Sequence, residues 1–139
     1  MFSYVCLGTN NLPLAVAFYD ATLAPLGLRR CTTPGEENWT GWAGWGTYED
    51  KGSQELALWV CTPFNGQAAT VGNGTMVAFK AKSWTAVQAF HEAALKNGGS
   101  SEGEAGLRPQ YNDDFYAAYV RDPDGNKLAV VCRGFTSAQ

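Results

Sequence analysis

The sequence is short of the residues and segments that several classes of function require. It has one histidine, and only 17% of its 139 residues are charged. No apolar run approaches the roughly 18 residues that span a bilayer, so no membrane is expected as a partner. The basic residues are scattered, with Arg29-Arg30 the only adjacent pair, and the net charge is −3. Nucleic-acid binding requires a basic patch, so no nucleic acid is expected either.

Signals for export and for disulfide or metal frameworks are also missing. The N-terminus lacks the basic segment and apolar core of a signal peptide, which predicts a cytoplasmic protein. None of the four cysteines has CxxC spacing, and free buried thiols are expected in a reducing compartment. The single histidine, His91, falls inside a predicted helix at an expected solvent-facing position. That placement argues against Ser–His and Cys–His catalysis.

Aromatic residues and an internal repeat are what the sequence does contain. There are five Trp, six Tyr and seven Phe. Met76 and Phe90 lie 72 positions after Tyr4 and Phe18, so both pairs have the same spacing. Each half begins with an alternating, strand-like segment and continues into an Ala/Phe/Leu-rich stretch that ends at glycine. A duplicated unit of this size predicts two similar modules.

Both halves predict one strand, one helix and about three further strands. Helix starts are indicated by the N-cap candidates Asn10-Asn11 and Ser83, and helix ends by Pro25 to Gly27 and by Gly98-Gly99. Residues 100–110 are predicted as loop, with room for one short strand. Strands are predicted at 2–9, 28–33, 34–47 (interrupted by a loop), 56–60, 75–82, 115–121 and 126–132. We predict one compact domain built of a first module at 1–63, a linker at 64–74, a second module at 75–133 and a tail at 134–139.

Three pieces of the sequence carry a family resemblance. They are the strand–Asn-Asn-Leu–helix start, Phe18-Tyr19 in the first helix, and Asp122-Pro123-Asp124-Gly125-Asn126-Lys127-Leu128 before the last strand. On a duplicated chain they make residues 2–133 resemble the vicinal oxygen chelate superfamily of glyoxalases, bleomycin-resistance proteins and extradiol dioxygenases. The resemblance implies an α+β fold in which two βαβββ modules form paired, cupped mixed β-sheets. It also implies a homodimer.

Enzymes of this superfamily bind a divalent metal in the cup through His and Glu on four strands. The resemblance implies that these ligand positions fall on Tyr4, Met76, Ala129 and either Leu58 or Ala57. None of these side chains suits Zn, Ni, Mn or Fe, which need imidazole or carboxylate ligands. The sequence therefore predicts the fold without the metal, and without any other cofactor.

The cup-facing positions predict a pocket of rings, sulfur and small groups. Alternation places Cys6 beside Tyr4 and Val131 beside Ala129, and the predicted hairpin pairs Tyr119 with Ala129. Such a lining favours a flat or apolar ligand that the tyrosine hydroxyls orient. The predicted ligand-binding residues are Tyr4, Cys6, Trp59, Met76, Tyr119, Ala129 and Val131, with Trp59 conditional on the parity of its strand.

Several roles stay open at this point. Glu55 points into the cup, where it is a candidate base, only if Ala57 does. Cys6 is either a nucleophile or a small wall residue. Arg108 is either an anion clamp at the rim or a surface charge. The Trp39–Trp45 segment is a pocket wall, a dimer contact or core.

The favoured function is the binding of a small molecule without its transformation, as in the resistance branch of the superfamily. One alternative is a glyoxalase-like lyase or isomerase that uses Glu55 or Tyr4 as acid and base. Another is an interaction module whose cup is filled by its own side chains.

Overall fold

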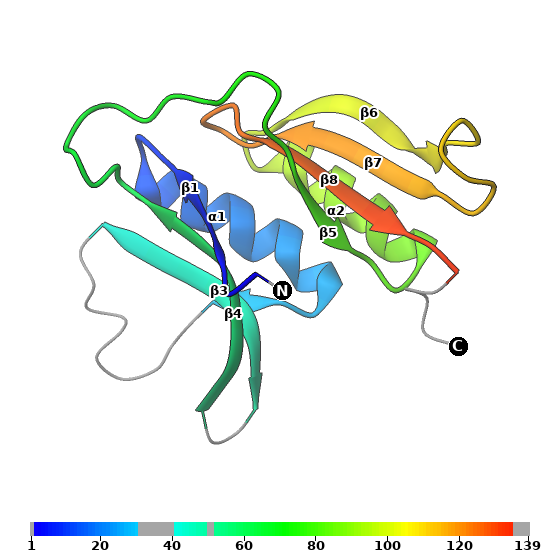
Figure 1. Cartoon of the computed structure of the whole chain (residues 1–139), viewed down its shortest axis with the longest axis horizontal. Helices are drawn as coiled ribbons and strands as arrows, with labels where there is room; N and C mark the ends of the chain where they lie inside the picture. The colour runs from blue at the N-terminus through cyan, green and yellow to red at the C-terminus, as the bar shows by residue number, and fades with distance from the viewer. Residues whose placement is uncertain (1, 31–40, 50–51, 135–139) are drawn as a thin grey trace.

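The described part of the chain forms eight strands and two main helices. A computed structural model describes residues 2–30, 41–49 and 52–134, with the side chains of 48–57 excepted. In both halves a strand precedes a helix and three strands follow it (Figure 1). The elements are β1 (Val5–Gly8), α1 (Leu12–Leu23), the 3-10 turn η1 (Ala24–Leu26), β2 (Arg29–Arg30), β3 (Trp42–Glu49), β4 (Gly52–Cys61), β5 (Val77–Lys80), α2 (Trp84–Lys96), β6 (Ser100–Leu107), β7 (Tyr116–Arg121) and β8 (Lys127–Cys132).

The strands form two four-stranded mixed sheets. Sheet A has the order β1-β4-β3-β2 and sheet B the order β5-β8-β7-β6. In each sheet the first strand runs parallel to the last, and the other neighbours are antiparallel. The predicted α+β fold of two βαβββ modules with paired mixed sheets is confirmed. The predicted division of the chain at residues 64–74 stays a prediction.

Both helices begin at the predicted caps. The Asn11 side chain accepts a hydrogen bond from the Leu14 N–H at 3.1 Å, and the Ser83 hydroxyl accepts one from the Ala86 N–H at 3.1 Å. Each bond satisfies one of the N–H groups that a helix start leaves without a partner. Gly27, at φ 77°, ends η1 in the left-handed conformation that glycine adopts most easily.

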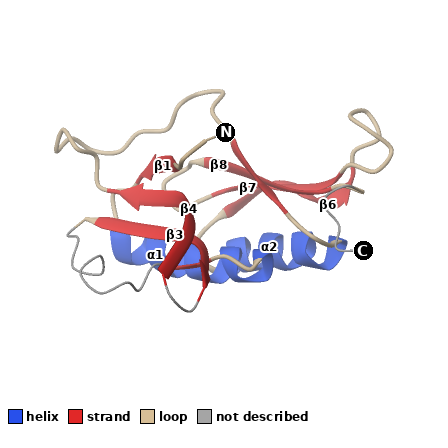
Figure 2. Ribbon diagram, turned by 60° about the horizontal axis from the view of Figure 1, so that its bottom comes forward, coloured by secondary structure: helices blue, strands red, loops and turns tan. Residues whose placement is uncertain are grey.

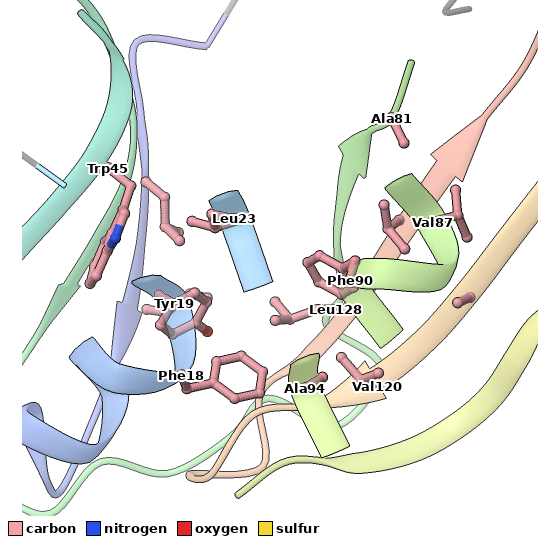
Figure 3. Close-up of a cluster of buried hydrophobic side chains, with 14 of the residues drawn as sticks. Phe18, Tyr19, Leu23, Trp45, Ala81, Val87, Phe90, Ala94, Val120 and Leu128 are labelled. Carbon is pink, nitrogen blue, oxygen red and sulfur yellow. The ribbon is translucent and has the colours of Figure 1, made fainter. Parts of the chain in front are cut away.

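A single buried cluster joins both sheets to both helices. The helices lie on one side of the sheets, as Figure 2 shows. Phe18 and Leu23 of α1 and Phe90 of α2 are fully buried, and burial of one such side chain contributes about 1.5–3 kcal/mol (Figure 3). The sheets contribute alternate residues of their inner strands, among them Trp45, Leu58, Val60, Val120, Leu128 and Val130. We call the side of each sheet turned away from the helices its open face.

The prediction for residues 100–110 was wrong in one respect, because the segment is mostly strand. β6 occupies Ser100–Leu107 and pairs with β7 alone, so it is an edge strand. Its register with β7 shifts on both sides of Gly103. Polar and glycine residues without alternation gave no strand signal, and the pairing partner is what orders them. β2 is shorter than predicted in the described part of the chain, because residues 31–33 lie outside it.

The turn at 122–126 fastens the second module to the first. The Asn126 amide donates to the Gly8 carbonyl at 3.0 Å, and the Asn10 N–H donates to the Asp124 carboxylate at 2.8 Å. The buried Tyr19 hydroxyl donates to the Asp122 carboxylate at 2.6 Å. The motifs that carried the resemblance, a hundred residues apart in sequence, are therefore in direct contact. Within the described residues, no helix is both long and apolar enough to span a membrane.

Candidate ligand-binding site

The open face of sheet A carries three of the predicted ligand-binding residues. Val5 and Leu7 of β1 pack on the core, so alternation turns Tyr4 and Cys6 to the open face. Tyr4, just before β1, is 59% exposed, and Cys6 is exposed too. β1 is parallel to β4 with Cys6 opposite Trp59, so Trp59, the third predicted residue, lies beside Tyr4 and Cys6.

The parity of β4 decides the position of Trp59. Leu58 is fully buried in the core, so Trp59 faces the open side. Its ring covers Gly44 of β3, where an added Cβ would lie 2.8 Å from the ring. The Trp42 ring meets it edge-on, with centroids 6.3 Å apart. Two indoles thus form a wall, while the Glu55 side chain lies outside the described residues and its role stays a prediction.

The register also corrects the fourth superfamily ligand position. Val5 pairs with Leu58 in sheet A, and its repeat counterpart Val77 pairs with Leu128 in sheet B. The counterpart of Ala129 is therefore Trp59, rather than Leu58 or Ala57. The 72-residue offset holds for the first strand and the helix, but the second module is two residues shorter by its last strand. Leu58 points away from the site.

The open face of sheet B carries the other four predicted residues. Val77 packs towards the core, so Met76 faces the open side and is 45% exposed. Tyr119 of β7 pairs with Ala129 of β8, as predicted, and Val131 follows on the same face. The structure thus gathers the predicted residues into two groups on two sheets.

Two positively charged side chains lie beside the Tyr119 ring. The Arg108 guanidinium lies 5.5 Å from the ring centroid and the Lys127 ammonium 5.9 Å from it. Arg108 is held in place because it donates to the Gly106 and Glu104 carbonyls at 2.8 and 2.6 Å. Burial, followed by the neighbouring Tyr111, raises the pKa of Tyr119, and Arg108 opposes the shift. The hydroxyl therefore stays protonated near neutral pH and can donate to a ligand.

A thiol pair stands beside Trp59 on sheet A. The Sγ atoms of Cys6 and Cys61 are 3.2 Å apart. Cys61 is buried at the end of β4, and burial, followed by the hydrogen bond with Cys6, raises its pKa to about 12. Cys61 was absent from the predicted lining, although it lies two residues after Trp59 and shares its face. The same alternation that placed Cys6 would have placed Cys61.

The remaining candidates divide between core and surface. Trp45 is fully buried, and its indole donates to the Asp20 carboxylate at 2.9 Å. Trp42 lies on the open face, and Trp39 lies outside the described residues. His91 is partly exposed on α2, and its ring bonds the Ser101 hydroxyl at 2.9 Å.

The residues at the four superfamily ligand positions do not fit a divalent metal. The resemblance implies Tyr4, Met76 and Ala129, and the register gives Trp59 as the fourth; they offer a phenol, a thioether, a methyl group and an indole. Borderline and hard dications bind imidazole, thiolate or carboxylate in sets of three or more. In the described ranges no three His, Cys, Asp or Glu side chains converge into such a set.

Comparison with known proteins gives matches among solved structures only. No protein-family model matches the chain, and a search of curated proteins finds no match. The structure of a glyoxalase/bleomycin resistance protein from Albidiferax ferrireducens T118 matches with 35% identity and a TM-score of 0.78, over 95% of this chain and 98% of that one.

Two more distant structures share the fold. A glyoxalase/bleomycin resistance protein/dioxygenase family enzyme from Burkholderia phytofirmans PsJN matches at 15% identity and a TM-score of 0.67, covering 94% of this chain and 97% of that one. A lactoylglutathione lyase from Agrobacterium tumefaciens matches at 18% identity and a TM-score of 0.58, covering 95% and 92%. At these identities the likeness concerns the fold alone.

Proposed function

This chain belongs to the glyoxalase/bleomycin resistance protein family, and on that premise we propose that it binds a small aromatic or apolar molecule without a metal. One observation carries the proposal. The positions at which superfamily enzymes hold their metal are occupied here by Tyr4, Trp59, Met76 and Ala129. Rings, a thioether and a methyl group provide dispersion contacts for a flat ligand and no charge for a cation.

The polar groups around this lining support a ligand with an apolar body and a polar or anionic end. The protonated Tyr119 hydroxyl is a donor, and Arg108 and Lys127 place positive charge beside its ring. Ligand sites generally combine a large apolar area with a few such groups that fix orientation. An aromatic carboxylate matches this arrangement better than a neutral hydrocarbon.

We propose sequestration rather than turnover. The seven lining residues contain no carboxylate or imidazole, the side chains that most often act as general acid or base near neutral pH. The raised pKa of Tyr119 moves its phenol further from that range. Incubation of a bound molecule with stoichiometric protein should return it unchanged, and formation of a product would favour the lyase or isomerase alternative.

A thermal-shift screen with aromatic and apolar molecules, in acid and neutral-amide forms, tests binding. A ligand at about 100 times its Kd stabilises the folded state by about 2.7 kcal/mol, a shift of several degrees. Tyr4→Ala and Met76→Ala remove exposed open-face side chains and should weaken the shift by about tenfold in apparent affinity. Leu95→Ala is the matched control, since its side chain is exposed on α2, on the helix side of the sheets, and it should leave the shift unchanged.

Two outcomes would overturn the proposal. One is a screen in which no aromatic or apolar molecule raises Tm. The other is purified protein that carries a stoichiometric divalent metal by elemental analysis.

We further propose that the protein acts as a homodimer, as the superfamily resemblance implies. The exposed apolar side chains on or beside the open faces support this, because a second copy would cover part of them; they are Phe2, Tyr4, Trp42 and Met76. Sedimentation at micromolar concentration should give twice the mass of one chain. A single-chain mass at that concentration would contradict it.

A further inference from the structure

Cys6 belongs to the proposed lining, but its contact with Cys61 plays no part in the proposed binding of a ligand, and the geometry of this contact is specific. The two sulfurs are 3.2 Å apart and belong to different strands, 55 residues apart in sequence. A disulfide bond is about 2.05 Å long, so the sulfurs need to approach by little more than one ångström. Diagonal neighbours in a sheet stand about 7–8 Å apart, near the upper limit for a disulfide, so closing the bond requires side-chain rotation together with a small local shift of the strands.

The sheet register explains why the sulfurs meet. β1 and β4 are parallel, with Cys6 opposite Trp59 and Gly8 opposite Cys61. The cysteines are therefore diagonal neighbours on one face, where side chains come within reach of each other. Gly8 contributes no side chain beside Cys61, and Ala69 and Pro63 cover the space above it.

The two thiols differ in access to solvent. Cys6 is exposed on an edge strand of sheet A, whereas Cys61 is 6% exposed and stands beside Trp42 of β3. An oxidant dissolved in water therefore meets Cys6 first, and Cys61 lies within reach of the product. Redox-sensitive cysteines commonly have this arrangement of an accessible thiol beside a resolving one.

We propose that Cys6 and Cys61 form a reversible disulfide in response to hydrogen peroxide. In the first step the Cys6 sulfur attacks one peroxide oxygen; the S–O bond forms, the O–O bond breaks, and the thiol proton leaves with the departing hydroxide as water. In the second step the Cys61 sulfur attacks the sulfenic sulfur; the S–S bond forms, the S–O bond breaks, and a second water leaves. A small-molecule dithiol restores both thiols by exchange through a mixed disulfide.

The order of the two steps follows from the environment of each sulfur. Burial and the neighbouring Cys6 keep Cys61 protonated near neutral pH, because its pKa is about 12. Thiolate is the form that attacks peroxide, so Cys61 is slow in the first step. Once Cys6 is oxidised, proximity replaces intrinsic reactivity and Cys61 completes the bond.

Peroxide treatment of the intact protein, followed by alkylation and peptide mapping, tests this proposal. Wild-type protein should lose two thiols and yield one intramolecular Cys6–Cys61 peptide pair that dithiothreitol reverses. Cys61→Ala should stop at a sulfenic acid on Cys6 that a cyclic diketone traps. Cys6→Ala should leave Cys61 reduced at the same dose. Cys132→Ala, which alters a thiol buried in the core of sheet B, should behave as wild type.

Tryptophan fluorescence gives a second readout that needs no variant. Trp59 and Trp42 are the cross-strand partners of Cys6 and Cys61, and a disulfide beside them should quench their emission until it is reduced. Three results would overturn the proposal: both thiols survive a dose that oxidises free cysteine, Cys6 stops at the sulfenic acid in wild-type protein, or the link joins two chains instead of two strands.

Discussion

At the scale of single residues, Tyr19 and Asp122 belong to a buried network of hydrogen bonds that centres on the Asp122 carboxylate. Asp122 is 4% exposed and accepts the Tyr19 hydroxyl at 2.6 Å. It also accepts the backbone N–H groups of Asp124 and Asn126 and the Asn126 amide, at 2.9 to 3.0 Å. A buried carboxylate with four donors is well satisfied, so loss of any one donor carries a cost.

Tyr19→Phe should therefore lower the free energy of unfolding by about 1–3 kcal/mol, since it leaves a buried charged acceptor with one donor fewer. Urea denaturation of both proteins measures the difference. Tyr4→Phe removes the same hydroxyl from a side chain that is 59% exposed, and it should change stability by less than about 0.5 kcal/mol. Equal effects of the two substitutions would show that the Asp122 contact contributes nothing particular.

Tyr19 also predicts how stability depends on alkaline pH. Burial, followed by the charge of Asp122, raises its pKa well above the ordinary value of 10.0. The unfolded chain then releases this proton at a lower pH than the folded one. The contribution of this pKa shift to the free energy of unfolding is fully present below about pH 10 and is lost as pH rises towards the pKa of Tyr19 in the folded protein. Urea denaturation between about pH 9 and about pH 11 should show that the free energy of unfolding falls less steeply with pH for Tyr19→Phe than for wild type.

Residue positions could be predicted where they depend on alternation alone. Tyr4 and Met76 follow from the pattern of their own strands, and both lie on open faces. Trp59 could not be assigned because its parity depends on the register between β4 and β1. That register is set by contacts between residues more than fifty positions apart. Lys127 was missed, and Trp42 was left open within the Trp39–Trp45 segment, because the approach of each to the site depends on cross-strand neighbours.

At the scale of elements, the pairing of β3 with β4 shapes the indole wall. Gly44 and Trp59 are directly opposite each other, and the indole lies over the glycine. Glycine leaves the space that the ring occupies, and the ring in turn covers backbone that a side chain would otherwise protect. This exchange of a small residue for a large ring recurs in sheets.

Gly44→Ala should displace the ring, because the added Cβ would lie 2.8 Å from it. We expect a loss of about 1–3 kcal/mol, as for other overpacked sites, together with a change in tryptophan emission. Gly106→Ala is the matched control in β6, where the nearest neighbour is the end of the Arg108 side chain at 3.2 Å rather than a packed ring. Stability measured by denaturation should fall more for Gly44→Ala, and the reverse order would show that Trp59 moves freely.

Element type could be predicted where the signal is local. Asn11 and Ser83 cap their own helices, so both helix starts were readable from short segments. β6 could not be recognised, because an edge strand of serine, glutamate and glycine carries no buried alternation. The sequence also could not show that the second module is two residues shorter than the first. That difference appears only from the pairing of β4 with β1 and of β8 with β5.

At the scale of the whole molecule, the turn at 122–126 and the shared core make one body of two repeated halves. The turn reaches Gly8 and Asn10 at the start of the first half, and the core receives side chains from both sheets. Sequence resemblance could indicate this architecture because the motifs in contact are themselves recognisable. It could not indicate whether the two groups of predicted lining residues face each other, because that depends on the relative placement of sheets A and B.

Oxidation of the thiol pair should change the stability of the whole molecule, because Cys6 and Cys61 enclose nearly the entire first half of the chain. A cross-link between residues 55 positions apart restricts the unfolded chain by about 4 kcal/mol in the chain-entropy model, and strain in the folded state lowers the gain. Peroxide-oxidised protein should therefore have a Tm several degrees above that of the reduced protein. Cys61→Ala should show no gain after the same treatment. An oxidised form less stable than the reduced form would mean that the bond strains sheet A by more than the entropy it removes.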